Sequence, residues 1–87
     1  MHVYNITCRI PEIVMGLIFR DVVSPEEIHH FIVKRGNPIS EDSDLSEIQK
    51  LAQDKFGGKR EIKDSWHGDF EWEPQVQVVN VSYLGAG

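Results

Sequence analysis

The sequence contains a single cysteine, Cys8, and this scarcity limits what can hold the fold together. An intramolecular disulfide cannot form, so the cross-linked framework typical of small secreted domains is excluded. Long apolar runs are also missing. The longest, residues 13–19, is interrupted by Gly16 and is far shorter than the roughly 20 residues that cross a bilayer. No basic region precedes the apolar residues of the amino-terminal segment. These features favour a soluble, cytoplasmic protein without a membrane partner.

Catalytic and cofactor motifs are lacking as well. The four histidines and one cysteine show no CxxC, HxxxH or HxH spacing, which are the spacings that zinc sites commonly use. Neither a GxSxG nucleophile elbow nor a glycine-rich phosphate loop occurs. Cys8 lies on the apolar side of an alternating segment, where a cysteine behaves as a small buried hydrophobe. The sequence therefore predicts no metal and no cofactor, and an enzyme is the less favoured class.

Length and charge describe one small acidic domain. With 87 residues, of which 40% are hydrophobic and 26% charged, the chain can build one core, so residues 1–87 are expected to form a single globular domain. The net charge of −5 comes from 14 acidic and 9 basic residues. Binding to a nucleic-acid backbone needs a basic face, so nucleic acid is disfavoured as a partner.

The first half of the chain predicts two strands and a helix. Residues 2–10 alternate between apolar and polar, which is typical of a half-buried strand. Residues 13–23 form a nearly continuous apolar run, which we interpret as a buried strand in preference to a short buried helix because it is rich in β-branched residues. Ser24 as a cap, Pro25 at the first position and Gly36 as a stop predict a helix over residues 25–35.

The second half predicts another helix and then strands. Ser43 or Asp44 can cap a helix whose apolar residues recur at helical spacing until Gly57. Residues 60–66 and 69–73 indicate two short strands around a turn, and residues 75–83 a stronger one. In this last strand the apolar parity changes at Val79, which indicates a bulge or burial on both faces.

These elements predict an α+β domain. Its expected order is β-β-α-α-β-β, a mainly antiparallel sheet of four to five strands with two helices packed on one face. The first strand and the last strand are expected to be neighbours in the sheet.

The stretch KDSWHGDFEWEP, residues 63–74, is the main candidate site. Asp69, Glu71 and Glu73 share one strand parity, and Phe70 and Trp72 share the other, so a hairpin with an acidic wet face and an aromatic core face explains the pattern. Trp66 and His67 fall at the turn, outside this alternation, where an exposed aromatic is a typical interface anchor. A binding surface is therefore the second interpretation, and carboxylate catalysis with His67 the third.

A second acidic group, Glu41, Asp42 and Asp44, lies at the start of the second predicted helix. Acidic residues there compensate the helix dipole, and if both groups converged they would form a negative patch for a basic protein surface.

We therefore expect a small acidic module that acts through protein–protein interaction, for example as a compact inhibitor of the kind that phages and mobile elements use against host machinery. The expected contact residues are Trp66, His67, Asp69, Glu71, Glu73, Glu41, Asp42 and Asp44. The alternative is a small homodimeric enzyme with a histidine and carboxylates at the subunit interface.

Overall fold

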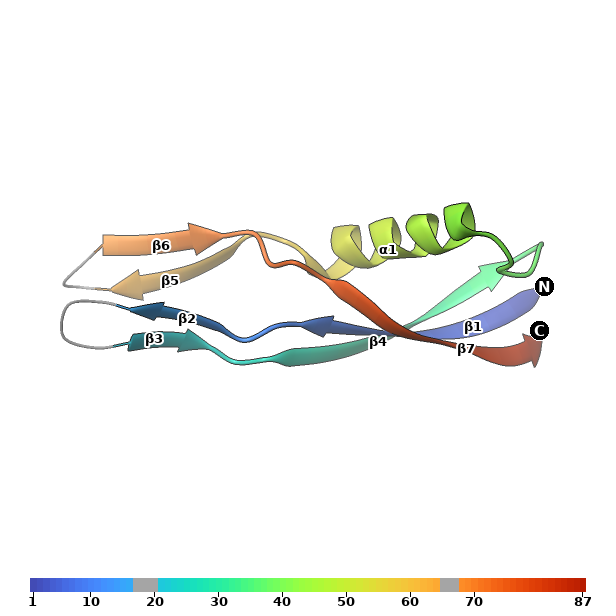
Figure 1. Ribbon diagram of the computed structural model, residues 1–87, viewed down its shortest axis with the longest axis horizontal. Coiled ribbons are helices and arrows are strands. Elements are labelled where there is room, and N and C mark those ends of the chain that lie inside the picture. Colours follow the sequence, from blue (N-terminus) through green and yellow to red (C-terminus); the bar gives the residue numbers. More distant parts are fainter. Residues whose placement is uncertain (17–20, 65–67) are drawn as a thin grey trace.

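The computed structural model describes residues 1–16, 21–64 and 68–87, and the chain is elongated, 53 Å along its longest axis and 15 Å along its shortest (Figure 1). Over these ranges it forms seven strands and one helix. Their bounds are β1 His2–Ile10, β2 Ile13–Gly16, β3 Asp21–Ser24, β4 Glu27–Arg35, α1 Asp42–Phe56, β5 Arg60–Asp64, β6 Gly68–Trp72 and β7 Gln77–Ala86. The predicted α+β arrangement, with two helices on a single sheet, is wrong: the described strands form three separate sheets and one helix accompanies them.

The helix predicted over residues 25–35 is the main error, because this segment is strand β4. It pairs antiparallel with β1 along its whole length, from His2 opposite Arg35 to Ile10 opposite Glu27. The side chains alternate as in a strand: Phe31 is half-buried, whereas Ile28 and Ile32 on the other face are each about half exposed. Local capping signals contribute about 1 kcal/mol each. A nine-residue ladder that also buries apolar area outweighs them.

The apolar run over residues 13–23 is not one strand. Its described ends are β2 and β3, which form an antiparallel pair with Val14 opposite Val23. The residues between them lie outside the described ranges. β1, β2, β3 and β4 together form one long hairpin, which extends from the core toward the same end of the molecule as the β5–β6 hairpin (Figure 1).

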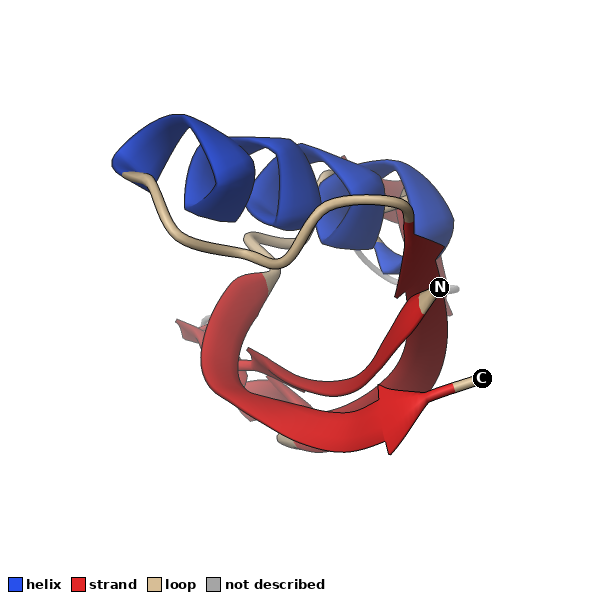
Figure 2. Ribbon diagram, turned by 90° about the vertical axis from the view of Figure 1, so that its right-hand side faces the viewer, coloured by secondary structure: helices blue, strands red, loops and turns tan. Residues whose placement is uncertain are grey.

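The core lies where α1 covers one face of the curved sheet β4-β1-β7 (Figure 2). Apolar residues of β1 point toward the helix, and Ile48 and Ala52 of the helix point back. The buried hydrophobic residues are Tyr4, Ile6, Cys8, Ile10, Ile48, Ala52 and Val76. The predicted alternation of residues 2–10 and the predicted pairing of the first and last strands are confirmed.

Helix α1 is also confirmed, and it ends as predicted at Gly57, whose amide donates to the carbonyl of Gln53 at 2.8 Å. Its N-cap is Glu41, which precedes the predicted caps Ser43 and Asp44 by two and three residues.

The predicted bulge in the last strand is confirmed. In the β1–β7 pairing, Thr7 lies opposite Asn80 and Cys8 lies opposite Val78, so Val79 is the extra residue. This insertion lets both Val78 and Val81 pack against the core, while Val79 remains 54% exposed. A second register shift, between Val3 and Tyr4, makes Leu84 an extra residue as well. The change of apolar parity in the sequence thus has a direct structural cause.

Candidate functional site

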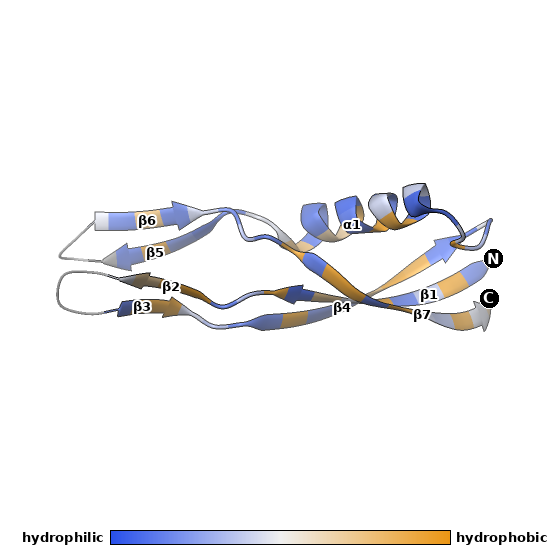
Figure 3. Cartoon of the chain, viewed as in Figure 1, coloured by the Kyte–Doolittle hydropathy of each residue, from blue (hydrophilic) through white to orange (hydrophobic). Residues whose placement is uncertain are grey.

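The β5–β6 hairpin carries the carboxylates that the sequence singled out. Its two strands pair antiparallel, with Lys63 opposite Asp69 and Ile62 opposite Phe70. Phe70 and Trp72 are half-buried, and Asp69, Glu71 and Glu73 are exposed, as the alternation predicts. Trp66 and His67 lie outside the described residues. The hairpin is mainly hydrophilic, in contrast to the neighbouring β2–β3 hairpin (Figure 3).

The register adds a fourth carboxylate to this face, Glu61 of β5, which lies directly opposite Glu71. We call the exposed set Glu61, Asp69, Glu71 and Glu73 the acidic hairpin face. Lys59 contacts Glu71 at 2.9 Å, and Lys63 lies opposite Asp69, so the face carries an excess of negative charge with two lysines among the carboxylates. Like charges directly opposite each other destabilise a strand pair. The sequence shows that Glu61 and Lys63 share a parity, but the opposition to Glu71 follows only from the register.

Arg60 anchors the base of this hairpin to the core. Its Nη2 donates to Glu27 Oε1 at 3.2 Å and to the carbonyl of Phe56 at 3.3 Å. Glu27 also contacts His29 at 3.0 Å, and the His29 ring stacks on Phe56 with centroids 4.5 Å apart. These contacts join β4, the end of α1 and the start of β5, so they fix the direction in which the acidic hairpin face extends.

The second predicted acidic group does not join the first. Glu41, Asp42 and Asp44 lie at the start of α1, whereas β6 lies at the opposite end of the long axis (Figure 1). Asp44 is already engaged, since Arg35 Nη2 contacts its Oδ1 at 2.7 Å. Arg35 also contacts Glu47 at 2.9 Å. Glu41 and Asp42 remain exposed.

Asp44 is the carboxylate with a clear electrostatic role in the fold. Its Oδ2 accepts hydrogen bonds from the backbone amides of Ser40 and Glu41, each at 3.1 Å. These bonds, together with the charge of Arg35, lower the pKa of Asp44 below its ordinary value. The loop that connects β4 to α1 is thereby tied to the first turn of the helix.

We expect the stability of the protein to fall in acid partly through Asp44. Because the pKa of Asp44 is lower in the folded than in the unfolded chain, its stabilisation is complete above the ordinary value of about 4 and is lost as the pH falls toward the folded pKa. The variant Asp44→Asn should be less stable than the unaltered protein at neutral pH. Its free energy of unfolding should also fall less as the pH is lowered below about 5, as urea unfolding at several pH values would measure. The matched control is Asp42→Asn, which replaces an exposed neighbour. If this control reduced the acid-induced loss of stability as much as Asp44→Asn does, the assignment to Asp44 would be wrong.

The surroundings of Cys8 and of the described histidines are explained by their contacts within the fold. Cys8 is fully buried in the core, and this burial raises the pKa of its thiol, which fits the inert role predicted for it. His30 contacts Thr7 at 3.0 Å and His2 contacts Tyr83 at 3.1 Å. Within residues 1–16, 21–64 and 68–87 no group of three side chains could hold a metal ion.

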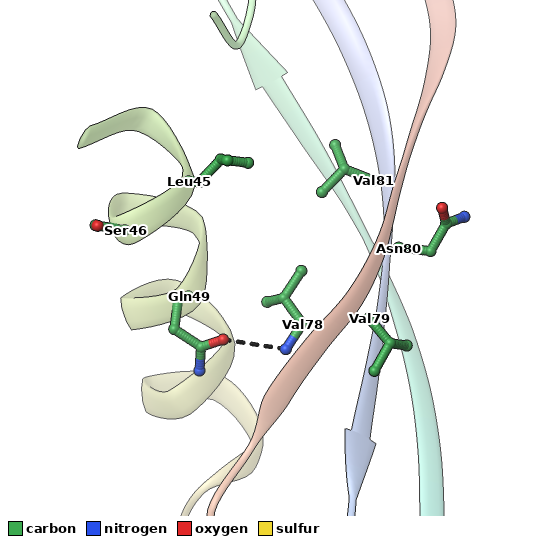
Figure 4. Close-up of a pocket in the computed structure, with 7 residues that line it drawn as sticks. All are labelled: Leu45, Ser46, Gln49, Val78, Val79, Asn80 and Val81. Carbon is green, nitrogen blue, oxygen red and sulfur yellow. Dashed lines mark hydrogen bonds between the residues drawn. The ribbon is translucent and has the colours of Figure 1, made fainter. Parts of the chain in front are cut away.

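A feature that the sequence reasoning missed lies between α1 and β7. A groove of about 560 Å³ is lined by Leu45, Ser46 and Gln49 on the helix and by Val78, Val79, Asn80 and Val81 on the strand. Figure 4 shows Val78 and Val81 pointing toward the helix, and Val79 and Asn80 pointing away from it.

Two glutamines of α1 bond the backbone of the segment that leads into β7. Gln49 accepts from the amide of Val78 at 3.0 Å, as Figure 4 shows, and donates to the carbonyl of Val76. Gln53 accepts from the amide of Val76 at 3.0 Å and donates to the carbonyl of Pro74 at 2.8 Å. The two glutamines are one helical turn apart. They bond backbone groups at every second residue of an extended segment, namely Pro74, Val76 and Val78. The side chains therefore occupy the place that a neighbouring strand would take.

Comparison of the chain with protein-family models, with curated proteins and with solved structures finds no match. Among the described residues, no helix is long and apolar enough to cross a membrane.

Proposed function

We propose that this protein acts by binding another protein through the acidic hairpin face, and that the partner presents a basic surface there. The observation that carries the proposal is the placement of four carboxylates, with Glu61 directly opposite Glu71, on the exposed side of a hairpin that extends from the core. An arrangement that lowers the stability of the free hairpin becomes favourable when cationic side chains lie against it.

The position of the hairpin supports this role. The core is formed by α1 and the sheet β4-β1-β7, so the acidic hairpin face contributes little to it. Its charges are exposed, and the pair formed by Lys59 and Glu71 is 62% and 51% exposed, where ion pairs contribute about 1 kcal/mol or less. A partner can therefore replace the lysine contacts at small cost, and long-range attraction would speed its approach.

Removal of two of these charges should weaken partner capture about ten-fold. The test variant combines Glu61→Gln and Glu71→Gln, and each lost charge contact is expected to cost roughly 0.7 kcal/mol, which together is about a factor of ten. The tagged protein is incubated with a lysate of its source cells at about 50 mM and about 200 mM salt, and captured proteins are quantified by mass spectrometry. The expected result is one stoichiometric partner whose capture falls with salt and falls again in the variant.

The matched control combines Asp42→Asn and Asp54→Asn, which remove two exposed negative charges from α1 and none from the acidic hairpin face. It should capture the partner as the unaltered protein does. Equal losses in the two variants would mean that net charge, and not the acidic hairpin face, controls binding. Undiminished capture by the hairpin variant would contradict the proposal.

A further inference from the structure

One polar side chain, that of Arg60, joins the β5–β6 hairpin to the rest of the fold. β5 and β6 pair with each other and with no strand of the other two sheets. Among the described residues of these two strands, only Arg60 forms a side-chain hydrogen bond or ion pair with another element, to Glu27 of β4 and to the carbonyl of Phe56 in α1. Arg60 is therefore the polar contact that orients the acidic hairpin face.

The contact between Arg60 and Glu27 is shared and incomplete. Glu27 Oε1, which accepts from Arg60 Nη2 at 3.2 Å, also contacts His29 Nε2 at 3.0 Å. Arg60 Nε is buried and has no hydrogen-bond partner within the described ranges, and such a donor offsets part of what the other bonds contribute. The two side chains are 37% and 32% exposed, so solvent also screens the ion pair. The contact is therefore only weakly stabilised.

The two backbone connections of the hairpin are held to different extents. After β6, Pro74 is fully buried and its carbonyl accepts from Gln53 at 2.8 Å, so this connection is fixed to α1. Before β5, no described hydrogen bond holds the backbone of Gly58. Exposed backbone with few contacts opens at a low free-energy cost. The hairpin can therefore turn about this second connection once Arg60 releases Glu27.

We propose that Arg60 positions the acidic hairpin face for its partner, so that loss of this cation weakens binding although it makes the protein more acidic. The inference rests on the proposed function. A basic partner is attracted by negative charge, so removal of a positive charge should by itself strengthen binding. Positioning predicts the opposite, because only molecules whose hairpin points in the binding direction contribute to the affinity. The sign of the effect separates the two roles of Arg60.

The test variant is Arg60→Met, which keeps an unbranched side chain and removes the charge and its donors. The matched control is Lys50→Met, which removes an exposed positive charge from α1, so both variants are one unit more negative than the unaltered protein. Capture of the partner from a lysate of the source cells should fall about five-fold for Arg60→Met. For Lys50→Met it should stay equal or rise. Capture by Arg60→Met at or above the level of the unaltered protein would overturn the proposal.

A second measurement, on the purified protein without any partner, tests the direction of the hairpin itself. Spin labels are attached at Val14→Cys on β2 and Lys63→Cys on β5, two exposed positions on hairpins that extend toward the same end of the molecule (Figure 1). Cys8 is fully buried and stays unlabelled. Double electron–electron resonance should give a narrow distance distribution for the unaltered protein and for Lys50→Met, and a broader one for Arg60→Met.

Glu27→Ala removes the same contact from β4 and serves as a second variant if Arg60→Met does not fold, as circular dichroism would show. Its distance distribution should broaden equally, and the combined variant should be no broader, because both changes remove one interaction. A narrow distribution in these variants would overturn the positioning role, whether or not a partner is captured. Failure of the unaltered protein to capture any partner would instead overturn the proposed function, and the distances alone would then decide whether Arg60 orients the hairpin.

Discussion

Replacing Ile48 with alanine is expected to lower the free energy of unfolding by about 2–5 kcal/mol. Ile48 is fully buried and belongs to a core that comprises seven buried hydrophobic residues in the described part of the chain. Small domains have total stabilities of about 5–15 kcal/mol, so this one change removes a large fraction. Urea unfolding followed by circular dichroism measures the effect.

The matched control for this substitution is Leu51→Ala in the same helix. Leu51→Ala removes a side chain of the same size as Ile48→Ala does, but Leu51 is 43% exposed. Alanine is a good helix former, so neither substitution weakens the helix itself. We expect a loss of about 1 kcal/mol or less, since little apolar area returns to water. Equal losses for Ile48→Ala and Leu51→Ala would show that the core does not lie under the inner side of α1.

The double variant Gln49→Ala, Gln53→Ala should be the second most damaging change, with a loss of about 2–4 kcal/mol. It removes four hydrogen bonds and leaves the partly buried backbone groups of Pro74, Val76 and Val78 without partners. Alanine favours the helix, so a loss of stability would come from the contact with the strand and not from the helix itself.

Gln75→Ala combined with Gln77→Ala is the corresponding control, because both of these glutamines are exposed. Their loss should change the free energy of unfolding by roughly 0.5 kcal/mol or less. Thermal and urea unfolding of both double variants would decide the matter. If the Gln49 and Gln53 variant unfolded at the same urea concentration as this control, the glutamine contacts would be incidental.

The sequence predicted the elements whose periodicity was unambiguous. β1 has strict alternation, α1 has apolar residues at helical spacing before a glycine stop, and β7 has a change of parity that the bulge at Val79 explains. The alternation of exposed acidic and half-buried aromatic side chains in β6 was also predicted correctly. The aromatic residues Phe70 and Trp72 do not belong to the core that α1 and the sheet β4-β1-β7 form, as the sequence had predicted them to. In each case one pattern fits one structure.

β4 failed because its pattern fits two structures. Ile28, Phe31 and Ile32 have the spacing of a helical stripe, and Ser24, Pro25 and Gly36 supply helix signals at both ends. The same residues also alternate, and the β-branched and aromatic side chains suit a strand. The choice depends on β1, whose paired residues lie 17 to 33 positions away along the chain, and local reasoning does not include them.

The candidate site was predicted in part for a similar reason. The exposed carboxylates of β6 follow from local alternation, but Glu61 joins them only through the pairing register of β5. No feature of the sequence distinguishes Gln49 and Gln53 from the other polar residues of the helix. Their role depends on the extended segment that begins at Pro74, which is distant in the chain and adjacent in space.

The separation of the acidic hairpin face from the core has a consequence for how much sequence change the protein can tolerate. The core is formed by α1 and the sheet β4-β1-β7, whereas Glu61, Asp69, Glu71 and Glu73 are exposed. Substitutions of exposed residues usually change the free energy of unfolding by about 0.5 kcal/mol or less. The charge pattern of this face can therefore be altered at little cost to the fold.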